Sequence, residues 1–262
     1  GSEMVSSPVG AIEYVYAYGM SQTGRFLRTF IYRDFNRDEQ GREVLDGIIA
    51  SVAGGNMGEF NQRFGQNSKD RNNTMHQSFP FASVTQIDSE TEEVDSLHSR
   101  IEERGSSIKV MYTNTSAEYH RGDASLIHTD PNGTRDIEQG PNTRVYHFAG
   151  AEHSFGVWPP SDIGVSMSGS ERSQNLRGVI DYSPLLRACL VNMDDWVCNG
   201  VEPPPSKHPR ISDDTLIHPS KLAETFIRIP GAHYPGRHAM PRRREFCPDI
   251  RTEHPGLLPP EV

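Results

Sequence analysis

Residues Ile12 to Gly24 read IEYVYAYGMSQTG, and this stretch decides the fold class. Its β-branched and aromatic residues through Tyr18 favour a strand, and the small residues that follow favour a tight turn. After Ser21, apolar side chains recur at helical spacing until a polar run begins at Asp34. The stretch therefore predicts a strand, a turn and a helix.

Three further short apolar segments are bounded by turn residues and predict strands: Gly47 to Val52, Ile108 to Thr113 and Arg144 to Phe148. None alternates cleanly between apolar and polar residues, and long connections separate them. Parallel sheets that are covered on both faces have this pattern. We therefore expect an α/β fold with a mostly parallel sheet and helices on both faces. Helices are expected at Val94 to Arg104 and at Pro184 to Asn199.

The domain organisation divides the chain at residue 205. Residues 1–205 are expected to form the α/β region, with a polar insertion at 56–91 that is either a lid or a plain surface excursion. Residues 206–262 are rich in Pro, His and Arg, and they read as an irregular tail packing on that region, with only a faint strand pattern at Thr225 to Ile229.

Composition narrows the possible partners. The 262 residues carry a formal net charge of -9, which opposes binding to nucleic acid, and the basic run at 242–244 reads as a solvated loop. No apolar run approaches the roughly 18 residues that a membrane span needs. The cysteines Cys189, Cys198 and Cys247 lack paired C-x-x-C spacing, so no metal site is expected. Cys189 and Cys198 would lie too far apart on one helix for a disulfide, while a pairing with Cys247 stays open.

Ser21 stands at the apex of the strand-to-helix turn, where a nucleophilic serine is lifted above the sheet in a G-x-S-x-G elbow. Gly19 supplies the first small neighbour. Thr23 takes the place of the second glycine, and Gly24 comes one residue later. The alternative interpretation of Ser21 is a helix N-cap.

An acid and a base follow the later strands in the order that a catalytic triad requires. Glu118 comes after the third strand and His153 after the fourth, so the parallel topology brings both to the edge that carries Ser21. Asp123 is the less favoured acid because more loop separates it from the strand. His147 lies inside the fourth strand, where packing is the expected role.

These residues resemble a bacterial branch of the α/β-hydrolase superfamily whose elbow reads G-x-S-Q-T-G. The similar stretches are YGMSQTGRFLR, ASVAGG, SLIHTD and AGAEH, between about Pro8 and Ser206. The resemblance implies a serine hydrolase of the esterase kind, acting on a small-molecule ester without a cofactor. Within that branch Thr23 is the normal residue.

The implied chemistry is acyl transfer, with Ser21 as nucleophile, His153 as base, Glu118 as its partner and the backbone N–H of Gln22 as one oxyanion donor. The elbow follows the fifth strand in such folds, so this chain resembles the C-terminal half of the sheet. Another chain or segment is expected to complete the sheet, or else the chain is a catalytically incomplete binding module. A serine peptidase or acyltransferase would use the same triad.

Overall fold

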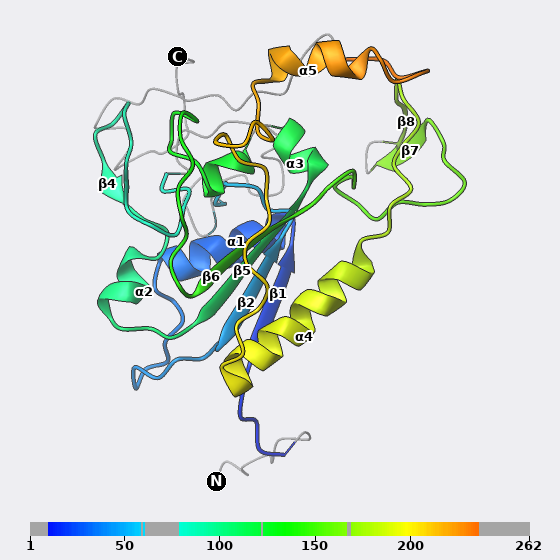
Figure 1. Cartoon of the computed structure of the whole chain (residues 1–262). Coiled ribbons are helices and arrows are strands. Elements are labelled where there is room, and N and C mark those ends of the chain that lie inside the picture. The colour runs from blue at the N-terminus through cyan, green and yellow to red at the C-terminus, as the bar shows by residue number, and fades with distance from the viewer. Residues whose placement is uncertain (1–9, 59, 61–78, 122, 167–168, 236–262) are drawn as a thin grey trace.

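A four-stranded parallel sheet forms the centre of the computed structural model, which describes residues 10–58, 60, 79–121, 123–166 and 169–235. Its strands are β1 (Tyr16–Met20), β2 (Gly47–Ser51), β5 (Lys109–Thr115) and β6 (Thr143–Phe148), in the order β1-β2-β5-β6 (Figure 1). The expected α/β class is confirmed. Arg242, Arg243, Arg244 and Cys247 lie outside the described residues.

One long helix covers each face of the sheet. Helix α1 (Gln22–Tyr32) lies behind the sheet in Figure 1 and α4 (Ser183–Asn199) lies in front of it. In β2, Ile48 and Ala50 are buried with residues of α1, whereas Ile49 is buried with residues of α4. Both sides of the strand therefore need apolar residues, which explains the missing alternation.

The first strand begins four residues later than the sequence predicts. Its neighbour β2 starts at Gly47, opposite Tyr16, so no ladder exists before that point. Val15 instead donates its N–H to the carboxylate of Asp46 at 2.8 Å. Without a paired neighbour, Ile12 and Tyr14 remain exposed.

The expected helix at 94–104 is only partly correct. Strands β3 (Gln86–Ile87) and β4 (Val94–Asp95) form a small antiparallel hairpin, and only Ser99–Glu103 is helical (α2). The Asp95 carboxylate accepts hydrogen bonds from the Ser96 N–H and the Ser99 hydroxyl, which fixes a turn where a continuous helix was expected. Residues 59 and 61–78 of the polar insertion lie outside the described residues.

The C-terminal segment returns along the free side of β6. Lys207 forms a parallel bridge with Tyr146, and its backbone exchanges hydrogen bonds with Val145 and His147. Beyond it, Pro219–Phe226 is a helix (α5), so the faint strand pattern predicted at 225–229 is wrong. Pro219 starts this helix, as prolines commonly do, and the imidazole of His218 accepts the Ser220 N–H at 3.3 Å.

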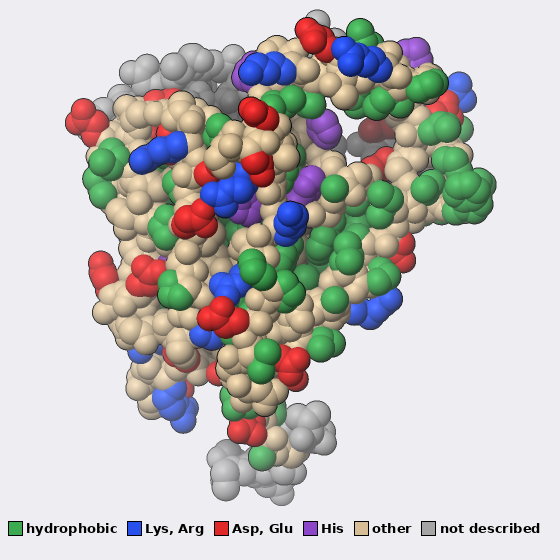
Figure 2. All heavy atoms as spheres, viewed as in Figure 1, with side chains coloured by type: hydrophobic (Ala, Val, Ile, Leu, Met, Phe, Trp, Pro, Cys, Tyr) green, Lys and Arg blue, Asp and Glu red, His purple; other side chains and the backbone are tan. Residues whose placement is uncertain are grey.

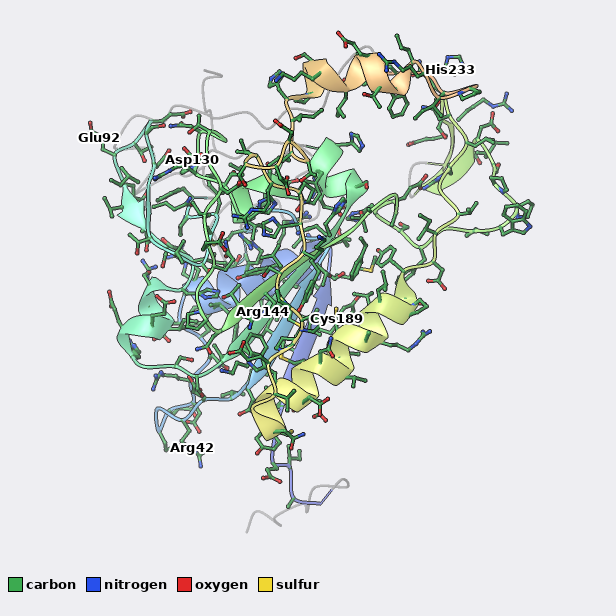
Figure 3. All side chains as sticks on the ribbon, viewed as in Figure 1. Arg42, Glu92, Asp130, Arg144, Cys189 and His233 are labelled. Atoms are coloured by element: carbon green, nitrogen blue, oxygen red, sulfur yellow. The ribbon has the colours of Figure 1, made fainter. Side chains whose placement is uncertain are left out.

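Helix α4 ends at Asn199 as predicted and begins one residue earlier than predicted. Proline follows its first residue, and Gly200 closes it with φ 66°, the left-handed conformation that glycine adopts without strain. Cys189 lies on the face that packs against the sheet (Figure 3), and both Cys189 and Cys198 are free. None of the helices in the described part of the chain is long and apolar enough to cross a bilayer.

Strand β1 is an edge strand among the described residues. Only β2 pairs with it, and Tyr18 on the strand is exposed, as are Tyr14 and Val15 just before it. An uncovered edge that carries aromatic residues offers both backbone hydrogen-bonding groups and apolar surface.

Candidate active site

The turn between β1 and α1 holds Ser21 in an unusual backbone conformation. Its φ is 56° and its ψ is -116°, a region that residues with a Cβ seldom occupy. The N–H of Ser21 donates to the carbonyl of Ser51 at 2.8 Å, and its own carbonyl accepts the N–H of Arg25 at 3.0 Å. These bonds to β2 and α1 hold the strained turn in place.

Close packing explains both glycines of the turn and the threonine between them. A Cβ on Gly19 would lie 2.5 Å from the Thr23 carbonyl oxygen, and one on Gly24 would lie 3.0 Å from the Ala53 Cβ. The Thr23 hydroxyl accepts the N–H of Met20 and donates to its carbonyl, both at 2.8 Å. Thr23 thus stabilises the turn through its hydroxyl. Gly24, one position later, is the residue that approaches β2 closely.

Glu118 is fully buried at the C-terminal end of β5. It lies in α3 (Ser116–His120), where one carboxylate oxygen accepts the N–H of Thr115 at 2.8 Å and its hydroxyl at 2.7 Å. Burial alone would raise the pKa of Glu118. The hydrogen bonds from His153 and Thr115 more than offset this, so the pKa lies below its ordinary value and the group is a carboxylate at neutral pH.

His153 connects the other two residues. Its Nδ1 lies 2.6 Å from Oε1 of Glu118, and its Nε2 lies 2.9 Å from Oγ of Ser21. The imidazole side chain is 39% exposed, whereas the carboxylate beneath it is buried. The three candidate residues, 132 and 35 positions apart in the chain, form one hydrogen-bonded series.

The loop that carries His153 is held from two sides. The hydroxyl of the buried Tyr182 donates to the His153 carbonyl at 2.8 Å. On the other side, the Ser116 hydroxyl accepts the N–H of Gly150 at 2.8 Å. Both contacts reach backbone atoms of the loop. They therefore fix the position of the His153 backbone, but not the rotation of its imidazole side chain.

A long excursion of the chain separates His153 from α4, and the two ends of this excursion are hydrogen-bonded to each other. The N–H of Gly156 donates to the Ile180 carbonyl at 2.9 Å, and Glu152 accepts bonds from Arg177 and from the N–H of Gly178. The excursion carries the antiparallel strands β7 (Ile163–Ser166) and β8 (Gly169–Arg172). Figure 2 shows hydrophobic side chains gathered over this flank, where Trp158 is 77% exposed.

The competing acid and base have other partners. The buried Asp123 is paired with Arg121 at 3.0 Å and accepts the Asn56 side-chain amide at 2.8 Å. His147 lies 3.2 Å from the Ser116 hydroxyl and packs against Tyr119, and burial lowers its pKa. Neither contacts Ser21, whereas Glu118 and His153 join it in one series.

Gln22 is the first residue of α1, so its backbone N–H belongs to the positive end of that helix beside Ser21. The sequence analysis missed Thr115, Ser116 and Tyr182 as supporting residues. The spacing T-x-x-E at Thr115 to Glu118 is a readable capping-box signal, but the contacts of Ser116 and Tyr182 depend on the tertiary fold. In the described part of the chain, no group of three or more His, Cys, Asp or Glu side chains is arranged to hold a metal ion.

Comparison with known families agrees with this architecture. Residues 4–228 match the family model described as alpha/beta hydrolase domain. The chain belongs to the α/β-hydrolase family. No curated protein and no solved structure matches it. Membership indicates hydrolase activity, and for this α/β hydrolase the choice of substrate has to be argued from the site itself.

Proposed function

We propose that this α/β hydrolase cleaves carboxylic esters through an acyl-enzyme intermediate, with Ser21, His153 and Glu118 as its triad. The observation that carries the proposal is the unbroken series of contacts from Ser21 Oγ to His153 Nε2 and from His153 Nδ1 to Glu118. A serine that merely caps a helix needs no such partners, and Ser21 makes no side-chain cap bond to α1.

In the first half-reaction His153 Nε2 accepts the proton of Ser21 as Oγ attacks the ester carbonyl. The Gln22 N–H donates to the oxyanion of the tetrahedral intermediate. His153 then gives the proton to the departing alcohol, which leaves Ser21 acylated. Water attacks the acyl group with His153 again as the base, and Ser21 regains its proton. Glu118 stays ionised and stabilises the imidazolium in both halves.

A fluorophosphonate reacts only with a serine that a working base activates, so it tests the first step directly. We expect one adduct in the intact mass, mapped to Ser21, and none on Ser21→Ala. Ser21→Ala should lower turnover of 4-nitrophenyl acetate by on the order of 10⁶-fold while the protein stays folded. The absence of an adduct on folded wild-type protein would refute the proposal.

Substrate choice within the acyl-transfer class is tested by three reactions of the unlabelled wild-type protein. We expect hydrolysis of the ester to be faster than hydrolysis of the matched anilide. Adding an alcohol acceptor should not divert most of the acyl group from water. A faster anilide reaction would instead make the protein a peptidase or amidase, and dominant transfer to the alcohol would make it an acyltransferase.

The uncovered edge of β1 favours a second candidate function, a binding module that another polypeptide completes. Tyr18 on the strand is exposed, and so are Tyr14 and Val15 just before it. On this hypothesis the chain associates in solution, and Tyr18→Lys prevents association because the charge would be buried in the contact. Solution scattering that reports a compact monomer, together with fluorophosphonate labelling of that monomer, would exclude it.

A further inference from the structure

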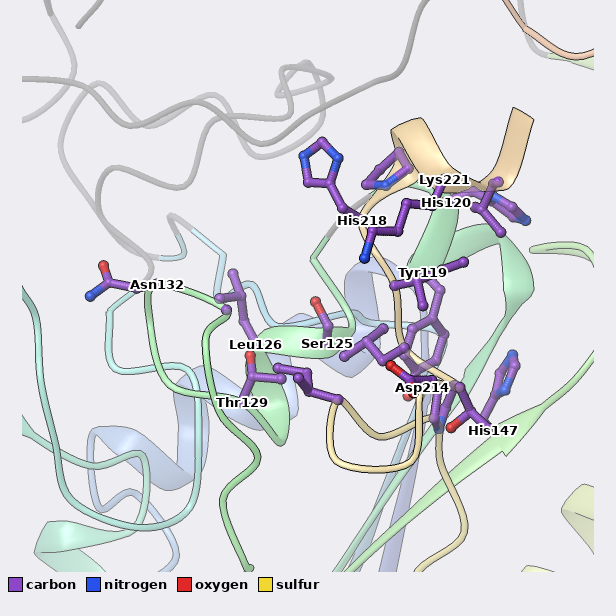
Figure 4. Close-up of a pocket in the computed structure, with 18 of the residues that line it drawn as sticks. Tyr119, His120, Ser125, Leu126, Thr129, Asn132, His147, Asp214, His218 and Lys221 are labelled. Carbon is purple, nitrogen blue, oxygen red and sulfur yellow. The ribbon is translucent and has the colours of Figure 1, made fainter. Parts of the chain in front are cut away.

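A cavity of about 620 Å³ lies beside α3, in a different place from the triad. Glu118 contacts His153, but the next two residues of α3, Tyr119 and His120, line the cavity (Figure 4). Neither Ser21 nor His153 lines it. Its volume falls within the range of about 300–1,000 Å³ that is usual for small-molecule sites.

The returning C-terminal segment forms one wall of this cavity. Residues 209–222 lie across it, and the segment is held there by the carboxylate of Asp136, which accepts the backbone N–H groups of Ile211 and Ser212, each at 2.9 Å. Arg210 adds an ion pair with Glu138 at 2.6 Å. The wall is therefore fixed to the body of the protein before any ligand arrives.

Part of the lining is apolar. Leu126 packs on the buried aromatic pair Phe79 and Phe81, and Leu216 and Leu222 come from the returning segment. Together these side chains form an apolar part of the wall that suits an apolar substituent of a ligand.

Two charged side chains of opposite sign lie on the cavity wall. Lys221 of α5 extends its amine into the cavity in Figure 4, and Asp214 lies on the same wall segment seven residues earlier. Among the described residues, no group of opposite charge lies within 4 Å of either one. Glu90 also lines the cavity, so the lining is not purely basic and does not favour a simple anion.

We propose that this cavity binds a small zwitterion with an apolar substituent, the chemical class of an apolar α-amino acid. Its carboxylate would pair with Lys221 and its ammonium group with Asp214, while its substituent lies against Leu126. A ligand with both charges satisfies both side chains, whereas an acid or an amine alone satisfies only one. The site is separate from the proposed triad and does not depend on hydrolase activity.

The test uses three probes that differ only in charge: L-leucine, 4-methylpentanoate, which lacks the ammonium group, and 3-methylbutylamine, which lacks the carboxylate. Binding is measured by calorimetry and by NMR of leucine methyl groups. We expect L-leucine to bind saturably below about 10 mM and each truncated probe to bind about tenfold more weakly, with the shifts centred on Leu126, Leu216 and Leu222.

Two substitutions make the assignment of each charge testable. Lys221→Met should weaken L-leucine binding about tenfold without affecting 3-methylbutylamine, and Asp214→Asn should weaken L-leucine similarly without affecting 4-methylpentanoate. Both residues are exposed, so neither change should disturb folding. Lys207→Met and Glu224→Gln are matched controls, because these exposed residues do not line the cavity.

Three results would overturn the proposal. One is the absence of saturable L-leucine binding, and another is equal binding of all three probes. The third is that Lys221→Met and Asp214→Asn behave like their controls. Fluorophosphonate labelling of Ser21 decides the proposed function in a separate assay, so failure of one proposal is distinguishable from failure of the other.

Discussion

Thr23 shows how one residue lets the turn that carries Ser21 depart from the usual G-x-S-x-G pattern. Its hydroxyl satisfies both the N–H and the carbonyl of Met20, and the neighbouring glycine takes over the close approach to β2. The sequence shows the departure, but only the packed turn shows why it is tolerated.

Thr23→Val keeps the side-chain shape and removes both hydrogen bonds, which leaves two backbone groups of Met20 without this partner. We expect the free energy of unfolding to fall by about 1–3 kcal/mol and fluorophosphonate labelling of Ser21 to slow. Urea denaturation and labelling rates measure the two effects. Thr23→Ser retains the hydroxyl and should stay close to wild type; equal losses in both variants would contradict the role given to the hydroxyl.

Tyr182→Phe removes the hydrogen bond to the His153 carbonyl while the ring stays buried. We expect kcat for 4-nitrophenyl acetate to fall about fivefold with little change in KM, since the bond positions His153 and does not contact the substrate. Tyr146→Phe is the control, because its hydroxyl bonds to Pro204, away from the triad. Equal kcat values for Tyr182→Phe and the wild type would show that the loop does not need this bond.

At the scale of elements, the local sequence pattern predicted the four strands of the central sheet and the long helix α4. It did not predict α5. The four strands and α4 have strong apolar patterns because both faces of the sheet are covered. Helix α5 is only eight residues long and buries no residue, and the tail around it was expected to be irregular. Its sequence does carry a signal, because Leu222, Ala223 and Phe226 recur at helical spacing after the proline that starts the helix. The late start of β1 depends on where β2 begins, which no local pattern contains.

The contact between α4 and the sheet depends on the absence of a side chain at Gly47. A Cβ there would lie 2.6 Å from Sδ of Met193 and 3.0 Å from the Tyr16 ring. We expect Gly47→Ala to lower the free energy of unfolding by about 1–3 kcal/mol, because the buried Met193 must move.

Gly140→Ala is the matched control for this packing test, since the nearest atom to its added Cβ lies 3.7 Å away. Thermal denaturation of both variants gives the comparison. Replacing glycine by alanine lowers the entropy of the unfolded chain and by itself stabilises the protein, so we expect no loss in Gly140→Ala. A loss there as large as that in Gly47→Ala would contradict the role given to the contact with α4.

The whole molecule contains buried histidines that resist protonation. Burial lowers the pKa of His98 to about 3, and the pKa of His128 also falls to about 3, chiefly through burial and then through the positive charge of His208 nearby. Each Nε2 faces a tyrosine hydroxyl, that of Tyr112 for His98 at 3.0 Å and that of Tyr119 for His128 at 2.8 Å. His128 also stacks on His208, with ring centroids 3.9 Å apart.

These lowered pKa values predict acid sensitivity above the usual range of carboxylates. The unfolded chain binds protons at these histidines below about pH 6.5 and the folded chain does not, so stability falls as pH falls. Each histidine should cost about 2 kcal/mol between neutral pH and pH 5. The contribution of Glu118, whose pKa is lowered, is lost only at pH values below its ordinary value of 4.5.

Urea midpoints at pH 7 and pH 5 measure this loss. His128→Gln should reduce the difference between the two pH values, because glutamine does not titrate. His233→Gln, which alters an exposed histidine, should leave the difference unchanged. A pH difference that is the same in all three proteins would contradict the role of His128.

The sequence indicated the α/β class, the order of strands along the chain and the three residues of the candidate site. It did not indicate the cavity beside α3, because that cavity is built from segments up to 141 residues apart, Phe81 to Leu222, whose approach depends on the return of the chain along β6. The approach of segments so far apart in the chain leaves no periodic pattern in the sequence.

The closed base of the excursion after His153 affects how this part of the chain can change during evolution. Gly156 and Ile180 are joined by a backbone hydrogen bond, so the 23 intervening residues begin and end at one point beside the histidine loop. Insertions, deletions or a whole replacement hairpin can be accepted there without altering the distance between Ser21 and His153. The excursion is thus a natural position for divergence between relatives and for grafting new loops onto an unchanged scaffold.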